Sequence, residues 1–292
     1  MKPQILVIAK DENTRGMMKS FFSEKGFNPI IIERNKIIPE QQIVVCEDGI
    51  RLGDTDIIKG TVAAIILDSG YMWPNPVLKP SMEIWEKYRN NLDEYLRNER
   101  ESFSLWYSLL EILNESIPLC INPQEAFEAE AFKPWALEKL GDSGVSVPMM
   151  ISGNDPDKIG SFIEKTPGHF LAIPLSEDDK PVWVTEYEVM LKDLNRIPVF
   201  LQSLSSRDAV HVFAVNGKPV VTNPESADIS HVLEQIPKIQ EILQMPFAHL
   251  IFRHSNDLVL SDFCASPDIG LFSKEEQGMI MDELWGFIEE KQ

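Results

Sequence analysis

Short apolar runs alternate with an amphipathic segment at the start of the chain. Residues 4–9 and 27–32 are apolar, and the segment between them carries apolar side chains at helical spacing, at Met17, Met18, Phe21 and Phe22. This order predicts strand, helix, strand. The next strand-like run covers residues 61–67, and the glycine and prolines of residues 68–76 end any regular element after it. A loop at the carboxyl end of a strand is a candidate cleft wall.

A long amphipathic region occupies residues 81–114. Its aromatic and aliphatic positions recur at steps of three or four, which predicts one or two helices with a wide apolar stripe. We interpret the stripe as core rather than as an aromatic ligand site. A short strand over residues 116–122 ends an N-terminal α/β domain with expected bounds 1–121. The stripe comprises Trp85, Tyr88, Leu92, Tyr95, Leu96, Phe103, Trp106, Leu110 and Leu113.

A smaller middle domain is predicted over residues 122–198, where short helices and strands alternate. We first expect a helix with Pro134 in its first turn that ends at 141–144, followed by extended chain over 145–151. A second helix follows, capped by Asp155-Pro156 and carrying Ile159, Phe162 and Ile163. The domain then continues with a strand over 170–175, an acidic turn over 176–180 and a strand over 182–187.

The last part, residues 199–292, has the signals of antiparallel β structure with added helices. Asn216-Gly217 accepts the positive φ values of a type I′ turn, so residues 211–215 and 218–221 predict a hairpin. The remaining expected elements are a helix around 229–243, a second hairpin of 250–253 and 258–262, and a final helix opened by a capping box of Ser273 with Glu276. The fold class is therefore α/β in front and α+β behind.

Composition excludes several functions. The 292 residues carry 27 Lys plus Arg against 46 Asp plus Glu, a net charge of −19, and no basic run, which argues against nucleic acid as a partner. No window approaches the roughly 20 apolar residues of a membrane helix, and the opening apolar run is too short for a signal peptide. We therefore expect a cytoplasmic protein without a membrane partner. Cys46, Cys120 and Cys264 lie far apart, which argues against a disulfide framework or a zinc site.

A series of short motifs keeps a fixed order along the chain. They are Ile121-Asn-Pro123 with Ala126, Ala129 and Ala131, Lys133-Pro-Trp-Ala-Leu137, Gly144-Val-Ser-Val-Pro148, Asn154-Asp-Pro156 with Phe162, Phe200-Leu-Gln-Ser-Leu204, Asp208, the hairpin 211–221 and Asp262-Phe-Cys-Ala-Ser-Pro267. In order and spacing they resemble the ATP-grasp superfamily. The resemblance is closest to the microviridin or graspetide macrocyclases, which cross-link ribosomally made peptides, and to glutamate-adding carboxylate–amine ligases.

The resemblance implies an architecture and a chemistry. It implies a Rossmann-like pre-ATP-grasp domain over residues 1–121 and a two-lobed ATP-grasp module, with its small lobe over 122–198 and its C-terminal lobe over 199–292. Ligases of this family activate a carboxylate as an acyl phosphate. They hold the triphosphate with two lysines and a Gly-rich loop, and surround Mg²⁺ with carboxylate and Asn oxygens.

The phosphate-binding positions depart from the family pattern. Lys133 matches the first lysine, but Ile173 stands at the second, and losing one unit charge at about 4 Å forfeits on the order of 4 kcal/mol at an effective dielectric near 20. The loop over residues 176–180 has no glycine and three acids, so it would repel a nucleotide. After Asp208, His211 stands where the family has an arginine, and a neutral imidazole supplies no fixed charge.

The metal-binding positions depart as well. The acid of the penultimate strand aligns with Ile251, and the family's Glu-x-Asn becomes Asp262-Phe-Cys264. A thiol is too soft a ligand for Mg²⁺, so Asp262 is the remaining candidate metal ligand. His249 and His254 could converge with His211 across the sheet, although no helical i, i+4 pairing supports a three-histidine metal site.

The resemblance also implies individual nucleotide contacts. Lys133 matches a phosphate ligand, the hinge around Gln202 and Leu204 matches main-chain groups that read adenine, and Asp208 and His211 match ribose, loop or phosphate contacts. Each residue has a plainer interpretation too. Lys133 is also typical of a solvated helix terminus, and Asp208 of a turn carboxylate.

Three functions remain open. The first is a degenerate ATP-grasp protein, a pseudoenzyme that binds a peptide or a partner enzyme in a peptide-modification pathway, with residues 154–184 as the peptide surface by resemblance. The second is an active ligase that uses ATP and Mg²⁺, in which Lys180, Lys192 or Arg196 supplies the missing charge. The third is a nucleotide sensor without turnover. The family also makes a homodimer possible.

Overall fold

The computed structural model describes residues 3–9, 12–33, 43–46, 49–52, 55–58, 62–67, 91–173, 181–185, 198–223, 229–266 and 269–291. The chain divides into two compact units, Met1–Gln124 with Ile288–Gln292, and Glu125–Phe287. Each unit has its own sheets. The predicted domain bounds, including the division between residues 198 and 199, stay a prediction. Among the described helices, none is both long enough and apolar enough to span a bilayer.

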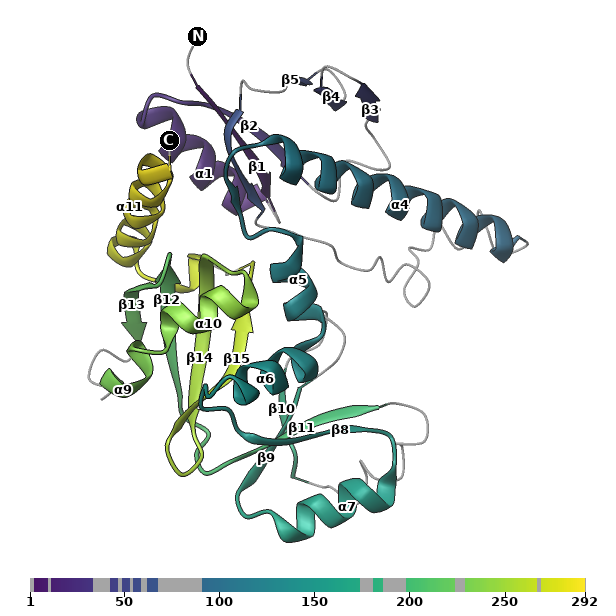
Figure 1. Ribbon diagram of the computed structural model, residues 1–292, viewed down its shortest axis with the longest axis vertical. Helices are drawn as coiled ribbons and strands as arrows, with labels where there is room; N and C mark the ends of the chain where they lie inside the picture. Colours follow the sequence, from purple (N-terminus) through teal and green to yellow (C-terminus); the bar gives the residue numbers. More distant parts are fainter. Residues whose placement is uncertain are drawn as a thin grey trace. The chain divides into compact units, whose positions relative to one another are not determined.

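The first unit is built on a parallel sheet in the order β2-β1-β6-β7 (Figure 1). Its strands are β1 (Gln4–Ala9), β2 (Asn28–Glu33), β6 (Val62–Leu67) and β7 (Cys120–Ile121). Strand β1 is central and nearly continuously apolar, and residues 5–9 have no exposed surface. Helix α1 (Glu12–Glu24) buries Met18 and Phe22. The predicted order of strand, helix and strand is therefore confirmed.

Helix α4 (Leu92–Ser116) forms the described part of the long amphipathic region. Asn91 caps it by accepting a hydrogen bond from the N–H of Glu94 at 3.2 Å. Trp106, Leu110 and Leu113 are buried, so the prediction of core is confirmed for these positions. Leu96 is 38% exposed, so the prediction of core is wrong there. Residues 81–90, with the predicted Trp85 and Tyr88, lie outside the described residues.

A small antiparallel sheet in the first unit has no counterpart in the sequence prediction. It has the order β3-β4-β5, from β3 (Ile43–Cys46), β4 (Gly49–Leu52) and β5 (Thr55–Ile58). Each strand has four residues, too few for an alternating pattern to stand out. Val44 and Val45 are both exposed, at 49% and 41%, so the hydrophobic pattern does not mark a buried face.

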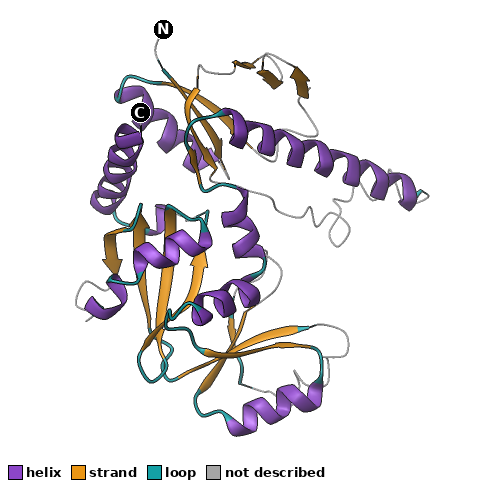
Figure 2. Ribbon diagram, in the orientation of Figure 1, coloured by secondary structure: helices purple, strands orange, loops and turns teal. Residues whose placement is uncertain are grey.

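The second unit begins with two short helices and a four-stranded antiparallel sheet. Helices α5 (Gln124–Ala131) and α6 (Lys133–Asp142), purple in Figure 2, precede the strands, which are orange there. The strands, labelled in Figure 1, pair in the order β10-β9-β11-β8. The strands are β8 (Met149–Gly153), β9 (His169–Ile173), β10 (Val182–Trp183) and β11 (Val199–Leu204). Helix α7 (Pro156–Lys165) packs on this sheet through Ile159, which contacts Leu201. Its predicted cap is confirmed, because Asp155 accepts from the N–H groups of two following residues.

A second antiparallel sheet has the order β13-β12-β14-β15. Its strands are β12 (Ala209–Val215), β13 (Lys218–Asn223), β14 (Phe247–His254) and β15 (Leu258–Cys264). Both predicted hairpins are present. Asn216 and Gly217 have φ values of 47° and 82°, as the type I′ turn requires. This turn is held by Gln240, whose carbonyl oxygen accepts from the N–H of Gly217.

The predicted helix around residues 229–243 is two helices, α9 (Ser230–Leu233) and α10 (Ile236–Leu243). Pro237 in the first turn of α10 lacks an N–H and favours a new helix start, which the apolar periodicity alone did not reveal. A 3₁₀ turn, η1 (Ile269–Leu271), leads to α11 (Lys274–Lys291). The predicted capping box is confirmed, since Ser273 and Glu276 exchange hydrogen bonds.

Candidate functional site

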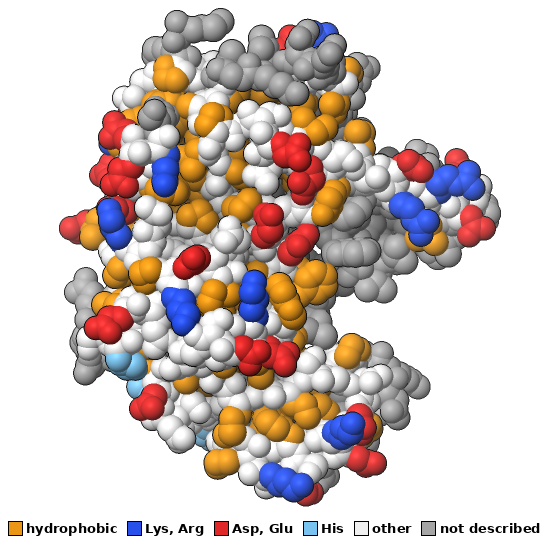
Figure 3. All heavy atoms as spheres, viewed as in Figure 1, with side chains coloured by type: hydrophobic (Ala, Val, Ile, Leu, Met, Phe, Trp, Pro, Cys, Tyr) orange, Lys and Arg blue, Asp and Glu red, His pale blue; other side chains and the backbone are white. Residues whose placement is uncertain are grey.

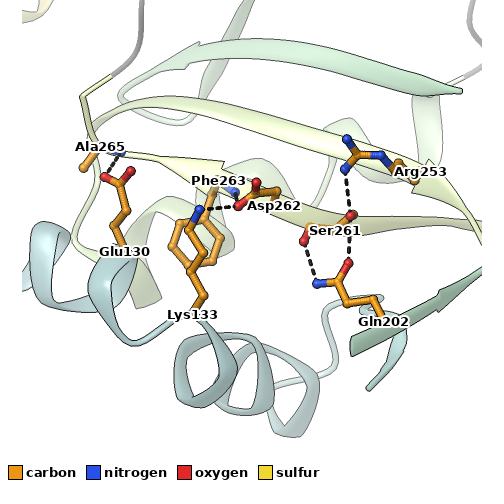
Figure 4. A network of polar contacts seen from close by, with 8 residues as sticks. All are labelled: Glu130, Lys133, Gln202, Arg253, Ser261, Asp262, Phe263 and Ala265. Atoms are coloured by element: carbon orange, nitrogen blue, oxygen red, sulfur yellow. Dashed lines mark hydrogen bonds and ion pairs between the residues drawn. The ribbon is translucent and has the colours of Figure 1, made fainter. Parts of the chain in front are cut away.

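Residues 261–265 of strand β15 and the turn after it lie at the centre of a polar network. Side chains from α5, α6, β11 and β14 reach this stretch (Figure 4). All of these elements belong to the second unit. The network brings together residues that are up to 135 positions apart in the chain. It is the place where the resemblance puts the phosphate and metal chemistry.

An ion pair joins Lys133, the first residue of α6, to Asp262. The two charged atoms, Nζ and Oδ1, are 2.7 Å apart, and the side chains are 21% and 10% exposed. Asp262 also accepts a hydrogen bond from the N–H of Phe263 at 2.9 Å. Burial alone would lower the pKa of Lys133, but the carboxylates of Asp262 and Glu130 outweigh it, and the pKa is raised. Lys133 is therefore held as a cation.

Glu130 lies one turn before Lys133 and binds the other end of the same stretch. Its carboxylate accepts a hydrogen bond from the N–H of Ala265 at 2.8 Å. Burial, followed by the negative charge of Glu130, raises the pKa of the Cys264 thiol well above its ordinary value. Cys264 is thus an un-ionised thiol. It offers neither the charge nor the hard oxygen atom that Mg²⁺ requires.

Gln202 on β11 is fully buried and ties that strand to β15. Its amide N–H donates to the carbonyl oxygen of Ser261 at 2.8 Å, and its own carbonyl accepts from the Ser261 hydroxyl at 2.9 Å. Arg253 on β14 donates from Nη1 to that hydroxyl at 2.9 Å. Its Nε is buried and has no hydrogen-bond partner among the described residues. Burial lowers the pKa of Arg253 and the Asp262 charge opposes this shift, but the guanidinium stays charged.

Two of the three predicted histidines converge. His211 Nδ1 and His249 Nε2 are 3.0 Å apart, so one ring donates to the other. Burial and the charge of Arg253 lower the pKa of His211. Burial, assisted by His211, lowers the pKa of His249 to about 4. Both rings are neutral near pH 7. His254 is exposed and does not join the pair.

Strand pairing brings the positions that match the family's metal ligands into two neighbouring rows of paired residues across the sheet. His211 pairs with Ile251, and Ile251 pairs with Asp262, so these three side chains share one face of the sheet. His249 and Cys264 pair in the next row. Asp262 is therefore the one carboxylate in these two rows, and it is paired with Lys133. The donor set does not fit Mg²⁺, which takes oxygen ligands in near-octahedral geometry. Among the described residues no cluster of three or more metal-ligating side chains is present.

Other predicted positions lie apart from the network. Leu204 is buried at the end of β11. Asp208 is exposed in a turn, where it accepts from the Ser206 hydroxyl at 3.1 Å. Ile173 is buried in β9. Whether any of the predicted site residues contacts a nucleotide stays a prediction. Lys180, Lys192 and Arg196, together with the acidic loop 176–180, lie outside the described residues.

Two functional candidates were missed by the sequence reasoning. Arg253 is a cation on β14 whose charge interacts with that of Asp262, and Glu130 is a second carboxylate whose charge acts on Lys133. Two signals were available. Arg253 stands two positions after Ile251 and so shares its face of the strand, and Glu130 stands three positions before Lys133, within reach on a helical turn.

Comparison with solved structures identifies the fold. The chain is similar to the ATP-grasp ligase PsnB complexed with a minimal precursor, Mg and ADP, with a TM-score of 0.78, 17% identity, and coverage of 99% of this chain and 96% of that one. It is similar to the macrocyclase MdnC from Microcystis aeruginosa bound with the precursor peptide MdnA, with a TM-score of 0.73, 12% identity, and coverage of 98% and 100%.

A third similar structure is a RimK domain ATP-grasp protein from Sphaerobacter thermophilus, with a TM-score of 0.61, 11% identity, and coverage of 96% and 98%. No protein-family model and no curated protein matches the chain. The chain therefore has the ATP-grasp fold over its whole length, and the predicted resemblance to peptide macrocyclases is confirmed at the level of fold.

Proposed function

We propose that this chain is a non-catalytic ATP-grasp relative that binds a peptide, or an enzyme acting on a peptide, in a peptide-modification pathway. One observation carries the non-catalytic part. Lys133 and Asp262, the two residues that match the family's phosphate and metal ligands, form an ion pair with each other at 2.7 Å. Each residue therefore has its charge neutralised within the protein.

The neighbouring positions support this proposal. A ligase needs a metal shell and several cations to stabilise the charge of a triphosphate during phosphoryl transfer. Here Ile251 and the un-ionised Cys264 flank Asp262, and the histidine pair is neutral. The charges of the network also argue against nucleotide binding. Its two cations, Lys133 and Arg253, are balanced by two carboxylates, Asp262 and Glu130. A nucleotide would add four negative charges to a balanced site.

Binding of a peptide is supported by the proteins with the same fold. Several of the similar structures were solved with a precursor or with a leader and core peptide. The candidate surface in this chain is the region of residues 154–184, which includes α7 and the edge strand β10. Val182 on that strand is 61% exposed, and the Arg207 guanidinium lies over the ring of Trp183. An edge strand with exposed apolar side chains can pair with an extended peptide.

On the face shown in Figure 3, Lys and Arg side chains are dispersed among acidic and apolar ones and form no continuous basic patch. The distribution of charge on this face therefore favours a peptide over a nucleic acid as the partner.

Calorimetric titration with ATP and Mg²⁺, followed by an assay of ADP release, tests the proposal. We expect no heat of binding and no ADP release, either alone or with peptides encoded by neighbouring genes. Binding without ADP release would instead identify a nucleotide sensor, and peptide-dependent ADP release would identify a working ligase. The peptide part is tested separately by calorimetric titration with the same peptides in the absence of nucleotide, where binding is expected.

The alternative of an active carboxylate–amine ligase is favoured by one observation. Arg253 places a second cation beside Asp262, and it could take the role of the lysine that Ile173 has replaced. If the alternative holds, Arg253→Met abolishes ADP release, while Arg100→Met, at an exposed position of α4, leaves it unchanged.

A further inference from the structure

The negative charge of Asp262 acts on cations from two different elements. It contacts Lys133 of α6 directly, at 2.7 Å. Arg253 of β14 stands two positions after Ile251, the residue that pairs with Asp262, so it lies on the same face of the sheet, and the Asp262 charge stabilises its protonated form. Asp262 is 7% exposed, so water screens these interactions only partly. One carboxylate therefore serves as counter-ion to both cations.

Glu130, the second carboxylate of the network, also stabilises the charged form of Lys133, to a smaller extent than Asp262. Glu130 accepts from the N–H of Ala265 and interacts with the Cys264 thiol. The histidine pair is neutral and faces this network from β12 and β14, so it adds no charge. Among the described residues, Arg253 has no ion pair within contact distance, and its buried Nε has no hydrogen-bond partner. A buried, unpartnered guanidinium N–H is unusual and indicates a position where an anion would be favourable.

We propose that Asp262 is an internal counter-ion that occupies the place of an anionic ligand between Lys133 and Arg253, so that the site is closed by an autoinhibitory contact of its own chain. This inference rests on the proposed function and goes beyond it. It says that the capacity to bind a phosphate-type anion is still present in Lys133 and Arg253, and that one side chain masks it.

Neutralising Asp262 is the test. Asp262→Asn keeps the shape of the side chain and an oxygen that can accept from the N–H of Phe263, but it leaves Lys133 and Arg253 with one counter-charge fewer. The probes are inorganic pyrophosphate and ADP, both without metal, measured by calorimetry. We expect the variant to bind pyrophosphate about tenfold or more tightly than the wild type, because removing one repulsive unit charge a few ångströms from a polyanion has at least this effect even in water.

The matched control is Asp257→Asn. Asp257 is exposed in the turn of the same hairpin, so this change alters the net charge equally without altering the network. No gain in pyrophosphate binding is expected. The double variant Lys133→Met/Asp262→Asn should lose the gain, which assigns the new affinity to Lys133. A folded Asp262→Asn protein, verified by circular dichroism, that binds no more pyrophosphate than the wild type would overturn the inference.

A second experiment measures the reactivity of Lys133 in the wild-type protein and needs no substitution. Lys133 should react more slowly with an amine-acetylating reagent than the exposed Lys139 of the same helix, and millimolar pyrophosphate should not change this rate. Pyrophosphate that further protects Lys133 would overturn the inference, because the anion would then compete freely with Asp262. Failure of the proposed function is distinguishable, since that failure is binding of ATP with Mg²⁺ by the wild type.

Discussion

Replacing Lys133 by methionine leaves the Asp262 carboxylate without its partner at 2.7 Å. Coulomb's law at an effective dielectric of 20 gives an attraction of about 6 kcal/mol for unit charges at this distance. Desolvation of both ions opposes that attraction, so the net interaction is smaller. Because both side chains are mostly buried, we expect Lys133→Met and Asp262→Asn each to destabilise the fold by about 2–3 kcal/mol.

The double variant Lys133→Met/Asp262→Asn removes both charges. It should be more stable than the sum of the single variants predicts, with an interaction energy of about 2 kcal/mol, because neither partner is left as an uncompensated buried charge. Urea denaturation gives the energies, and hydrogen exchange of the β15 amides reports the local change. Additive single effects would refute the interpretation of the pair as a buried, coupled interaction.

An exposed ion pair of similar length provides the control. Lys218 and Glu283 are 2.9 Å apart, with side chains 60% and 35% exposed. The corresponding cycle of Lys218→Met and Glu283→Gln should give an interaction energy of about 0.5 kcal/mol, since water screens the charges. The comparison separates burial from contact distance as the cause of the coupling.

Three further predictions concern stability. Burial lowers the pKa of His249 from 6.5 to about 4, so the unfolded chain takes up the proton first as the pH falls. The free energy of unfolding, measured by urea titration, should therefore drop by about 2 kcal/mol between pH 7 and pH 5. If His249→Gln leaves this pH profile unchanged, His249 is not its cause. Gly168 has φ +120°, and a Cβ there would lie 2.7 Å from the Leu204 carbonyl oxygen, so Gly168→Ala should lower the free energy of unfolding by about 2 kcal/mol or more. The control is Gly278→Ala in α11, where the added Cβ meets open space and the free energy of unfolding should rise by about 0.5–1 kcal/mol. Ser273→Ala removes the α11 cap and should cost about 1 kcal/mol by thermal unfolding, with no loss expected from a Ser273→Thr control.

Local signals in the sequence predicted much of the second unit. The Asn216-Gly217 turn, the Asp155 cap and the Ser273 capping box each depend on a few adjacent residues, and each is present. The helix break before α10 was missed, because the apolar periodicity runs through residues 229–243, and the effect of Pro237, which cannot lie in the interior of a regular helix, was not weighed against it. The sheet β3-β4-β5 was missed because its four-residue strands leave valines exposed.

The candidate site was predicted as a set of residue types but not as a network. Lys133 and Asp262 were each identified from their motifs, yet their ion pair joins elements 129 positions apart and depends on packing that no local pattern encodes. The same holds for Arg253, whose role follows from its neighbours on β15. The sequence offered His211, His249 and His254 as a group that could converge across the sheet, and only His211 and His249 do so.

Equilibrium dialysis of ATP in excess Mg²⁺ against the wild-type protein tests the central claim most directly, because it measures bound nucleotide without requiring turnover or a known peptide. The account predicts equal ATP concentrations on both sides of the membrane at millimolar nucleotide, since the Lys133–Asp262 pair neutralises the surviving ligands. An excess of ATP on the protein side that depends on Mg²⁺ and disappears in Lys133→Met would contradict it.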